Sequence, residues 1–182
     1  KAGKILYIGG STMPAYKFAQ LITLAECKGY IRPISMQNLY NLIQRDEERD
    51  MIPLCIEACV GLIPYSPLAR GVLAGNRSAG GIGKTERAKY DKGLLTGASL
   101  FRDSDKQVVT NVIAVAEKYN IKPTQVALSW ILNKSGVVSP IIGATKLSHI
   151  SDAVSSIDIE LSSEDIKKLE SAYQPRVAEP NI

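Results

Sequence analysis

Short apolar runs of strand length alternate along the chain with longer stretches in which apolar residues recur at helical spacing. The first run, residues 4–10, ends in glycines and is followed by Pro14, a residue suited to the first turn of a helix. From Tyr16 the apolar positions keep the helical period until Gly29, which suits a helix C-terminus. This segment is predicted to form one complete βα unit.

The same pattern occurs three more times. Strand-like runs lie at residues 34–38, 60–65 and 138–143, and the first of them precedes a predicted helix over about residues 46–58. Strands that alternate with helices indicate a parallel sheet, because each parallel crossover needs an element that covers the sheet. The chain is therefore predicted to be an α/β protein with about four βα units.

Other segments complete the outline. Two helices are predicted between the third and fourth strands, over about residues 104–119 and 123–133. A last helix is expected after Ser162, which forms an approximate capping box with the acidic residues that follow it. The glycine-rich stretch at residues 75–100 is expected to be a flexible loop, and residues 174–182 are expected to be a surface tail.

The composition narrows the class of protein. With 45% hydrophobic and 22% charged residues the chain lies in the range of a globular domain, and its net charge of +4 comes from scattered lysines and arginines. Nucleic acid is not a favoured partner, and the apolar runs are too short to cross a membrane. Three cysteines, a single histidine and the lack of a signal-peptide pattern lead us to expect a cytoplasmic protein without a metal site.

Ligands of parallel α/β folds bind at the carboxyl ends of the strands, so the residues after each apolar run are the candidate site. They share a polar or aromatic character: Ser11 and Thr12, Gln37 and Asn38, Tyr65 and Ser66, and Gly143 to Thr145. None forms a metal-ligand cluster, a nucleophile beside a histidine or a close carboxylate pair. The pattern suits a site that holds a ligand better than one that attacks it.

Four sequence motifs give the chain a specific resemblance. They are GKILYIG at 3–9, MQNLYN at 36–41, IPYSPLARG at 63–71 and PIIGATK at 140–146. In this order and spacing they resemble the aldo-keto reductases, above all the aryl-alcohol-dehydrogenase-like and potassium-channel-β-subunit-like branches. The resemblance implies a (β/α)8 TIM barrel of which residues 1–182 supply the C-terminal half, namely strands five to eight and a C-terminal helix.

The resemblance also implies how the nicotinamide half of NADP(H) is held. Ser11 and Gln37 match residues that hydrogen-bond the carboxamide, Thr12 stands where the family usually has Asn or Arg, and Tyr65 matches the aromatic that stacks on the ring. Thr12 is therefore expected to make a weaker contact. The loop around the pyrophosphate corresponds to Ser66, Pro67, Leu68, Ala69, Arg70 and Gly71.

The adenosine end is expected at the turn into the helix that follows the fourth strand. Gly143, Thr145 and Lys146 match the site of the 2′-phosphate, which favours NADP(H) over NAD(H). His149 and Asp152 match residues that contact the adenine. Ala153 replaces the usual Asn, so we expect fewer adenine contacts than in the family.

No catalytic residue is assigned. The family's Asp, Tyr, Lys and His lie on strands one to four, which have no counterpart here, while Tyr40, Tyr65 and His149 align with non-catalytic positions. We therefore predict the cofactor-binding half of an NADP(H)-dependent carbonyl reductase or alcohol dehydrogenase that acts on an aldehyde or ketone. The alternative is a non-catalytic NADP(H)-binding regulatory or interaction module, and either one is expected to need the N-terminal half or to oligomerise.

Simpler interpretations of the same residues stay open from the sequence. Ser11 is also in place to cap the helix after Pro14, Tyr65 is also typical of a core aromatic at the end of a strand, and Lys146 is also typical of a solvated charge. Cys55 and Cys59 are expected to pack as small hydrophobes, with a regulatory thiol as the alternative.

Overall fold

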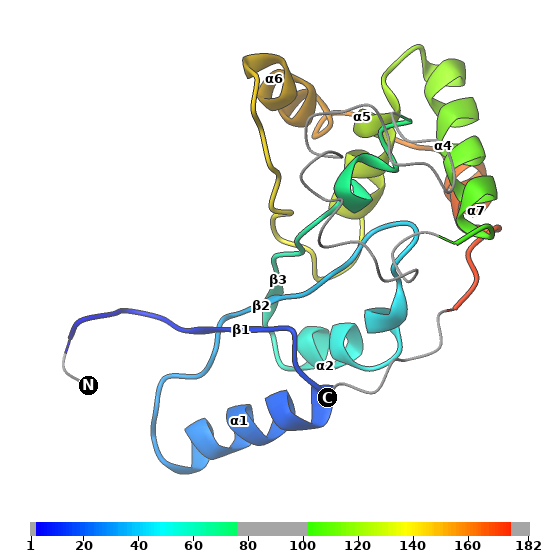
Figure 1. The fold of residues 1–182 in the computed structure, drawn as a ribbon. Helices are drawn as coiled ribbons and strands as arrows, with labels where there is room; N and C mark the ends of the chain where they lie inside the picture. Colours follow the sequence, from blue (N-terminus) through cyan, green and yellow to red (C-terminus); the bar gives the residue numbers. More distant parts are fainter. Residues whose placement is uncertain (1–2, 76–101, 176–182) are drawn as a thin grey trace, which may run out of the picture.

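The computed structural model describes residues 3–75 and 102–175 (Figure 1). Three parallel strands, β1 (Gly9–Ser11), β2 (Ser35–Gln37) and β3 (Gly61–Leu62), lie in this order in one sheet. A fourth segment continues the sheet beyond β3, because Val137 forms a parallel bridge with Leu62 and Ile141 forms one with Tyr65. The predicted α/β fold with a parallel sheet is confirmed.

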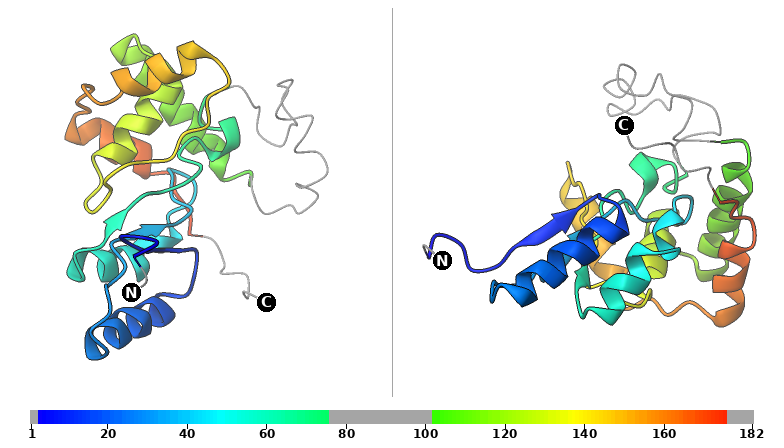
Figure 2. Two further views of the ribbon diagram at one scale, coloured as in Figure 1. Left: turned by 90° about the vertical axis from the view of Figure 1, so that its left-hand side faces the viewer. Right: turned by 90° about the horizontal axis from the view of Figure 1, so that it is seen from below.

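The helices form two groups around this sheet. Helices α1 (Ala15–Cys27) and α2 (Met51–Glu57) lie together on one side of the strands, while the remaining helices lie at the other end of the molecule (Figures 1 and 2). That second group consists of α4 (Asp105–Tyr119), α5 (Pro123–Leu132), α6 (Leu147–Ser155) and α7 (Ser163–Glu170). Two single 3-10 turns, η1 (Asp46–Glu48) and η2 (Ala69–Gly71), lie in the loops after β2 and β3.

The core lies between the sheet and the helices. Phe18 of α1, Met36 of β2, Leu62 of β3 and Trp130 of α5 are all buried and belong to one hydrophobic cluster. At Gly10 a side chain has no room, since a Cβ there would lie 2.6 Å from Met36 Cε and 2.8 Å from Phe18 Cε2. The glycine lets α1 pack directly on the first strand.

The strands are shorter than predicted, and prolines explain where the ladders stop. The run at residues 4–10 contributes only Gly9 and Gly10 to β1. The last hydrogen bond of the ladder runs from the Ile34 N–H to the Ile8 carbonyl, at 2.9 Å. The ladder ends there because the preceding residue, Pro33, has no N–H to donate. The run at 138–143 forms a single isolated bridge, at Ile141, in place of a strand, since Pro140 interrupts it; the other bridge, at Val137, lies just before the run.

The helices follow the prediction with one exception. Helix α1 ends where Gly29, at φ 61°, and Tyr30 donate to the carbonyls of Glu26 and Ala25, as the glycine signal predicted. The single helix predicted over about 46–58 is wrong: it divides into η1 and α2, so that Pro53, which lacks an N–H, falls in the first turn of α2. The loop at 75–100 and the tail at 174–182 lie almost entirely outside the described residues.

A buried carboxylate, Asp165, joins the end of α4 to the start of α7. Lys118 donates to it at 2.8 and 2.9 Å, the Tyr119 hydroxyl at 2.7 Å and the Ser162 hydroxyl at 2.5 Å. These donors, Lys118 first, lower the pKa of Asp165 to about 2. The Ser162 hydroxyl also accepts from the Asp165 N–H at 3.2 Å, which confirms the predicted cap.

Asp165→Asn is expected to lower the free energy of unfolding by about 1–3 kcal/mol near neutral pH, because charge-assisted hydrogen bonds are lost. The folded-state pKa lies below the ordinary 3.8, so this stabilisation is fully present above about pH 4 and is lost as the pH falls through about 2. Urea unfolding of both proteins from neutral pH to about pH 2.5 checks this. A difference between them that stays constant below pH 4 would contradict the assigned ion pair.

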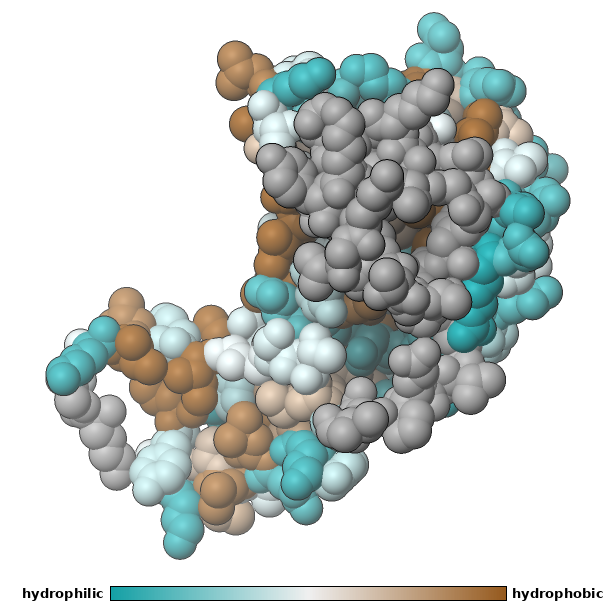
Figure 3. All heavy atoms as spheres, in the orientation of Figure 1, coloured by the Kyte–Doolittle hydropathy of each residue, from teal (hydrophilic) through white to brown (hydrophobic). Residues whose placement is uncertain are grey.

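Large hydrophobic residues remain exposed at both outer edges of the sheet. We call them the edge patches: Ile5, Leu6 and Tyr7 ahead of β1, and Val138, Ile141, Leu147 and Val154 beyond β3. Figure 3 shows hydrophobic residues gathered in both places, over the segment before β1 and beside α6. Exposed hydrophobic patches of this kind are typical of surfaces that other parts of a protein cover.

Candidate ligand site at the carboxyl ends of the strands

The ladder of the sheet places the ends of the strands side by side. Ser11 is the register partner of Gln37, and the Thr12 N–H donates to the Gln37 carbonyl at 3.0 Å. Tyr65 then bridges Leu39 on one side and Ile141 on the other. The predicted strand-end residues are thus brought to one edge of the sheet, as the parallel topology requires.

The side chains at this edge are accessible to a ligand. Ser11 and Thr12 are exposed, while Gln37 and Tyr65 are half-buried. The cap of α1 is Pro14, without a side-chain hydrogen bond, so Ser11 does not cap this helix. The hydroxyl of Ser11 stays available to the edge.

A tight turn follows Tyr65 and contains the residues matched to the pyrophosphate loop. Ser66, Ala69, Arg70 and Gly71 have φ values of 53°, 47°, 55° and 94°, so three non-glycine residues adopt the left-handed region. Such a conformation costs about 1–2 kcal/mol per residue and persists only where neighbouring contacts enforce it. Pro67 is buried and Leu68 is partly buried against the core, which fixes the turn to the fold.

The start of α6 contains the residues matched to the adenosine end. Gly143, Thr145, Lys146 and His149 are exposed, and Lys146 is the N-cap residue without a side-chain hydrogen bond to the helix. The Thr145 N–H donates to His149 Nδ1 at 3.4 Å, so the imidazole folds back over the first turn. The segment reaches this position beside Tyr65, since the Ile141 N–H donates to the Pro64 carbonyl at 2.7 Å.

Asp152 has a partner within the protein. Its carboxylate accepts from Lys122 Nζ at 2.7 and 2.8 Å, which ties α6 to the start of α5. Asp152 is 24% exposed in its side chain, so the pair lies at the surface. The role of Asp152 toward adenine stays a prediction, because a ligand there competes with Lys122.

The chemical groups at this edge match those needed to bind a nicotinamide dinucleotide. A carboxamide needs both a donor and an acceptor, which Gln37 and Ser11 supply, and a planar ring needs a flat face such as that of Tyr65. The Lys146 side chain and the uncapped N-terminus of α6 both favour an anion. Among residues 3–75 and 102–175, no group of three or more His, Cys, Asp or Glu side chains is placed to hold a metal ion.

Three residues that were rejected as catalysts, Tyr40, Tyr65 and His149, differ in their surroundings. Tyr40 is buried, its hydroxyl donates to Glu48 at 2.7 Å, and burial followed by that hydrogen bond raises its pKa far above the ordinary value. A proton held in this way is poorly suited to acid catalysis. Tyr65 lies at the end of the third strand and His149 in the first turn of α6, as described above.

The cysteines follow the prediction only in part. Cys55 is buried in the core and packs as a small hydrophobe. Burial raises the pKa of its thiol to about 11, which keeps the thiol protonated. Cys59 lies beyond the end of α2 and is exposed, which makes the expectation for Cys59 wrong. The two residues, four positions apart, would share a face of one continuous helix, but α2 ends at Glu57 and the backbone turns at Cys59, at φ 53°.

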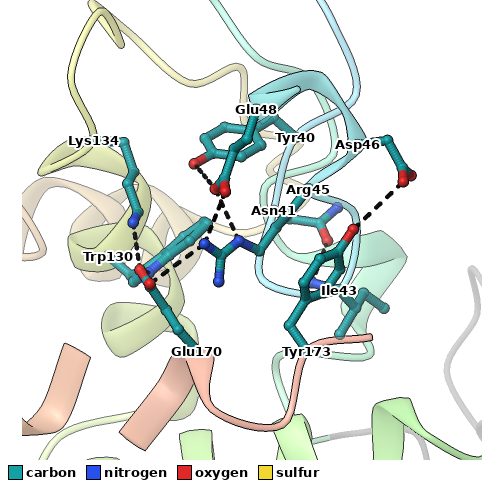
Figure 4. Close-up of polar contacts among 10 residues, drawn as sticks. All are labelled: Tyr40, Asn41, Ile43, Arg45, Asp46, Glu48, Trp130, Lys134, Glu170 and Tyr173. Atoms are coloured by element: carbon teal, nitrogen blue, oxygen red, sulfur yellow. Dashed lines mark hydrogen bonds and ion pairs between the residues drawn. The ribbon is translucent and has the colours of Figure 1, made fainter. Parts of the chain in front are cut away.

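A polar network beside the strand ends was not predicted from the sequence. It joins the loop after β2 to α5 and α7, and Figure 4 shows its members converging. We call it the Arg45 network: Tyr40, Arg45, Glu48, Trp130, Lys134 and Glu170. Its cations and anions balance, which is the condition under which charges are stable away from water.

Arg45 contacts both carboxylates of the Arg45 network. Arg45 donates twice to Glu48 at 2.8 Å and once to Glu170 at 3.3 Å. Burial opposes the charge of Glu170, but hydrogen bonds from Lys134 and Trp130 outweigh it and lower its pKa. The arginine also lies over the rings of Trp130 and Tyr173, at 5.7 and 5.1 Å.

The fold and the site together define an α/β protein with a parallel sheet and a row of polar groups at its carboxyl edge, the arrangement that carries the ligand site in (β/α)8 barrels. Residues 1–174 match the aldo/keto reductase family, whose fold is this barrel. The chain belongs to the aldo/keto reductase family, and the resemblance found in the sequence is confirmed. Enzymes of this family are oxidoreductases that generally use NAD(P)H.

The chain is similar to fungal members of the family. It is 44% identical to an aryl-alcohol-dehydrogenase-like protein of Schizosaccharomyces pombe over 175 residues. This match covers 96% of this chain and 48% of that protein. It is 39% identical over 184 residues to versiconal hemiacetal acetate reductase of Aspergillus parasiticus, covering 99% and 52%. The chain therefore spans about half the length of the relatives it matches.

None of the helices in the described ranges is long and apolar enough to cross a membrane.

Proposed function

We propose that this chain is the cofactor-binding half of an NADP(H)-dependent carbonyl reductase or alcohol dehydrogenase. The observation that carries the proposal is the ladder that aligns Ser11, Gln37, Tyr65 and the segment leading to Lys146 along one edge of the sheet. In a member of this family, that edge is where a nicotinamide cofactor is expected. The cytoplasm is the proposed location, where the three free thiols stay reduced.

Each group has a proposed task at the nicotinamide end. Gln37 and Ser11 fix the carboxamide, and through it the face of the ring that meets the substrate. Tyr65 packs against the opposite face and keeps the ring from rotating. When bound, NADPH supplies the hydride for an aldehyde or ketone carbonyl. The chain's own residues orient the ring and exclude water from one side of it.

The edge patches support a proposal about the rest of the barrel. Among residues 3–75 and 102–175 no further strand pairs with either outer edge of the sheet, and each edge carries exposed hydrophobic residues. The relatives are about twice as long as this chain. A parallel barrel buries such edges by closing the sheet. We propose that four further βα units, in the same polypeptide or in a second one, cover both edge patches and provide the catalytic acid.

Lys146→Ala tests the proposed 2′-phosphate contact. The dissociation constant for NADPH is expected to rise about tenfold, because one charge-assisted hydrogen bond to phosphate is lost. The dissociation constant for NADH, which lacks that phosphate, is expected to stay the same. Fluorescence titration with each cofactor measures both values.

Lys167→Ala is the matched control for this titration. Lys167 is an exposed lysine on α7, away from the start of α6, so its removal changes the net charge equally without touching the candidate site. Equal losses for NADPH and NADH in Lys146→Ala, or equal losses in both variants, would refute the contact between Lys146 and the phosphate.

A further inference from the structure

The turn at residues 66–71 needs an external support, since it contains three non-glycine residues in the left-handed region. Its internal hydrogen bonds run from the Ala69 N–H to the Ser66 carbonyl at 2.9 Å and from the Gly71 and Leu73 N–H groups to the Leu68 carbonyl at 2.8 and 3.2 Å. These bonds close the turn on itself. They do not fix it relative to the neighbouring strand end.

Besides the packing of Pro67 and Leu68, a side-chain hydrogen bond from Asn41 connects the turn to the loop after β2. Asn41, which is 1% exposed, donates from Nδ2 to the Ser66 carbonyl at 2.9 Å, while its Oδ1 accepts from the Ile43 N–H at 3.0 Å. Both ends of the amide are therefore used. The Ser66 carbonyl is thereby shared between its own turn and the loop after β2.

Asn41 itself is fixed by its surroundings. Its backbone N–H and carbonyl form reciprocal hydrogen bonds with Gln44, at 3.1 and 3.0 Å. Gln44 is followed by Arg45, whose contacts in the Arg45 network attach this loop to α7 and α5 (Figure 4). A hydrogen-bond donor on a loop that is held in this way can fix the backbone geometry of the residue it contacts.

We propose that Asn41 is a positioning residue for cofactor binding: its amide holds the 66–71 turn in the shape that receives the pyrophosphate of NADP(H). This inference rests on the proposed function. Asn41 is buried behind the turn and acts through Ser66. Without the amide donor, the Ser66 carbonyl loses a partner and the left-handed residues relax toward ordinary backbone conformations.

Two substitutions remove this donor and keep the local turn. Asn41→Asp has the same shape and still accepts from the Ile43 N–H, but it presents an oxygen to the Ser66 carbonyl. Asn41→Ser is neutral, and its hydroxyl can accept from Ile43 as in an ST turn, yet it is too short to reach Ser66. Agreement between the two separates the lost donor from the added charge.

Asn111→Asp is the matched control. Asn111 is also buried, and its Nδ2 donates to a backbone carbonyl, that of Lys168, at 2.7 Å. It joins α4 to α7 and does not contact the turn. This variant loses the same kind of hydrogen bond and reports the effect of general destabilisation.

Hydrogen exchange and NADPH titration of the 182-residue chains form the test. Both Asn41 variants should exchange the amides of Ala69, Gly71 and Leu73 faster than wild type and bind NADPH about fivefold to tenfold more weakly. Asn111→Asp should change neither these exchange rates nor the affinity for NADPH, even if its melting temperature falls as much as that of the Asn41 variants. Wild-type exchange and wild-type affinity in both Asn41 variants would overturn the inference. Absence of NADPH binding by the wild-type chain would instead refute the proposed function, and the exchange rates distinguish the two failures.

Discussion

Trp130→Ala is expected to lower the free energy of unfolding by about 3–5 kcal/mol, the range measured for large aromatic residues removed from protein cores. Trp130 is 1% exposed and is the largest of the fully buried side chains in the described part of the chain. Its ring packs at 5.3 Å from that of Tyr40, so alanine leaves a cavity between α5 and the loop after β2. Because domains of this size are stable by only about 5–15 kcal/mol, the loss is a large share of the total.

The same substitution disturbs the Arg45 network. Trp130 Nε1 donates to Glu170 at 2.9 Å, and the ring lies 4.7 Å from Lys134 Nζ and 5.7 Å from Arg45 Cζ. Trp130→Phe keeps most of the ring and removes the donor, so a smaller loss of about 1–2 kcal/mol is expected. Together the two variants separate packing from hydrogen bonding.

Urea unfolding followed by circular dichroism measures both effects. Tyr16→Ala provides the control, since Tyr16 is 61% exposed on α1 and its removal should change the stability by less than about 0.5 kcal/mol. A Trp130→Ala protein as stable as the Tyr16→Ala protein would show that the ring is not part of the core.

If the proposed function holds, the 182-residue chain alone is expected to consume no NADPH in the presence of an aldehyde, because the proton donor for the carbonyl oxygen is proposed to lie in the complementary four βα units. A positioned proton donor accelerates such a step by about 100-fold to 10,000-fold. The resemblance to the family assigns this task to residues of strands one to four, and Tyr40 is engaged with Glu48.

Turnover is expected to appear when the chain is supplied with the complementary four βα units of a relative, either fused or co-purified. Loss of NADPH absorbance on addition of the aldehyde follows the reaction, and the complementary units alone serve as the control. Aldehyde-dependent oxidation by the 182-residue chain on its own would contradict the account. A complemented barrel that binds NADPH without turnover would favour the alternative of a regulatory module.

The existence and order of the elements could be predicted because apolar periodicity reports which face of a segment is buried. Their exact ends could not, since they depend on single backbone donors. Pro33 and Pro140 stop the ladders, and Pro53 sets the start of α2. The prediction therefore placed the strand ends at the correct edge and made the strands themselves too long.

The common position of the candidate site residues was predictable to the same extent. Ser11, Gln37 and Tyr65 follow apolar runs, so their common edge follows from parallel topology. The Arg45 network was missed because its contact between Arg45 and Glu170 joins residues 125 positions apart, and no periodic pattern reports such a pair. The only local signal for Asn41 was its place just after the strand-end run QNLY, where Asn commonly forms hydrogen bonds with nearby backbone.

The proposed binding of NADP(H) at the carboxyl edge of the sheet can be measured on the purified chain by titration with NADPH, followed by the fluorescence of the dihydronicotinamide ring. We expect saturable binding to one site per chain and weaker binding of NADH. In Tyr65→Ala the increase in NADPH fluorescence on binding is expected to be lost. A titration that does not saturate, or one that Tyr65→Ala leaves unchanged, would contradict this proposal.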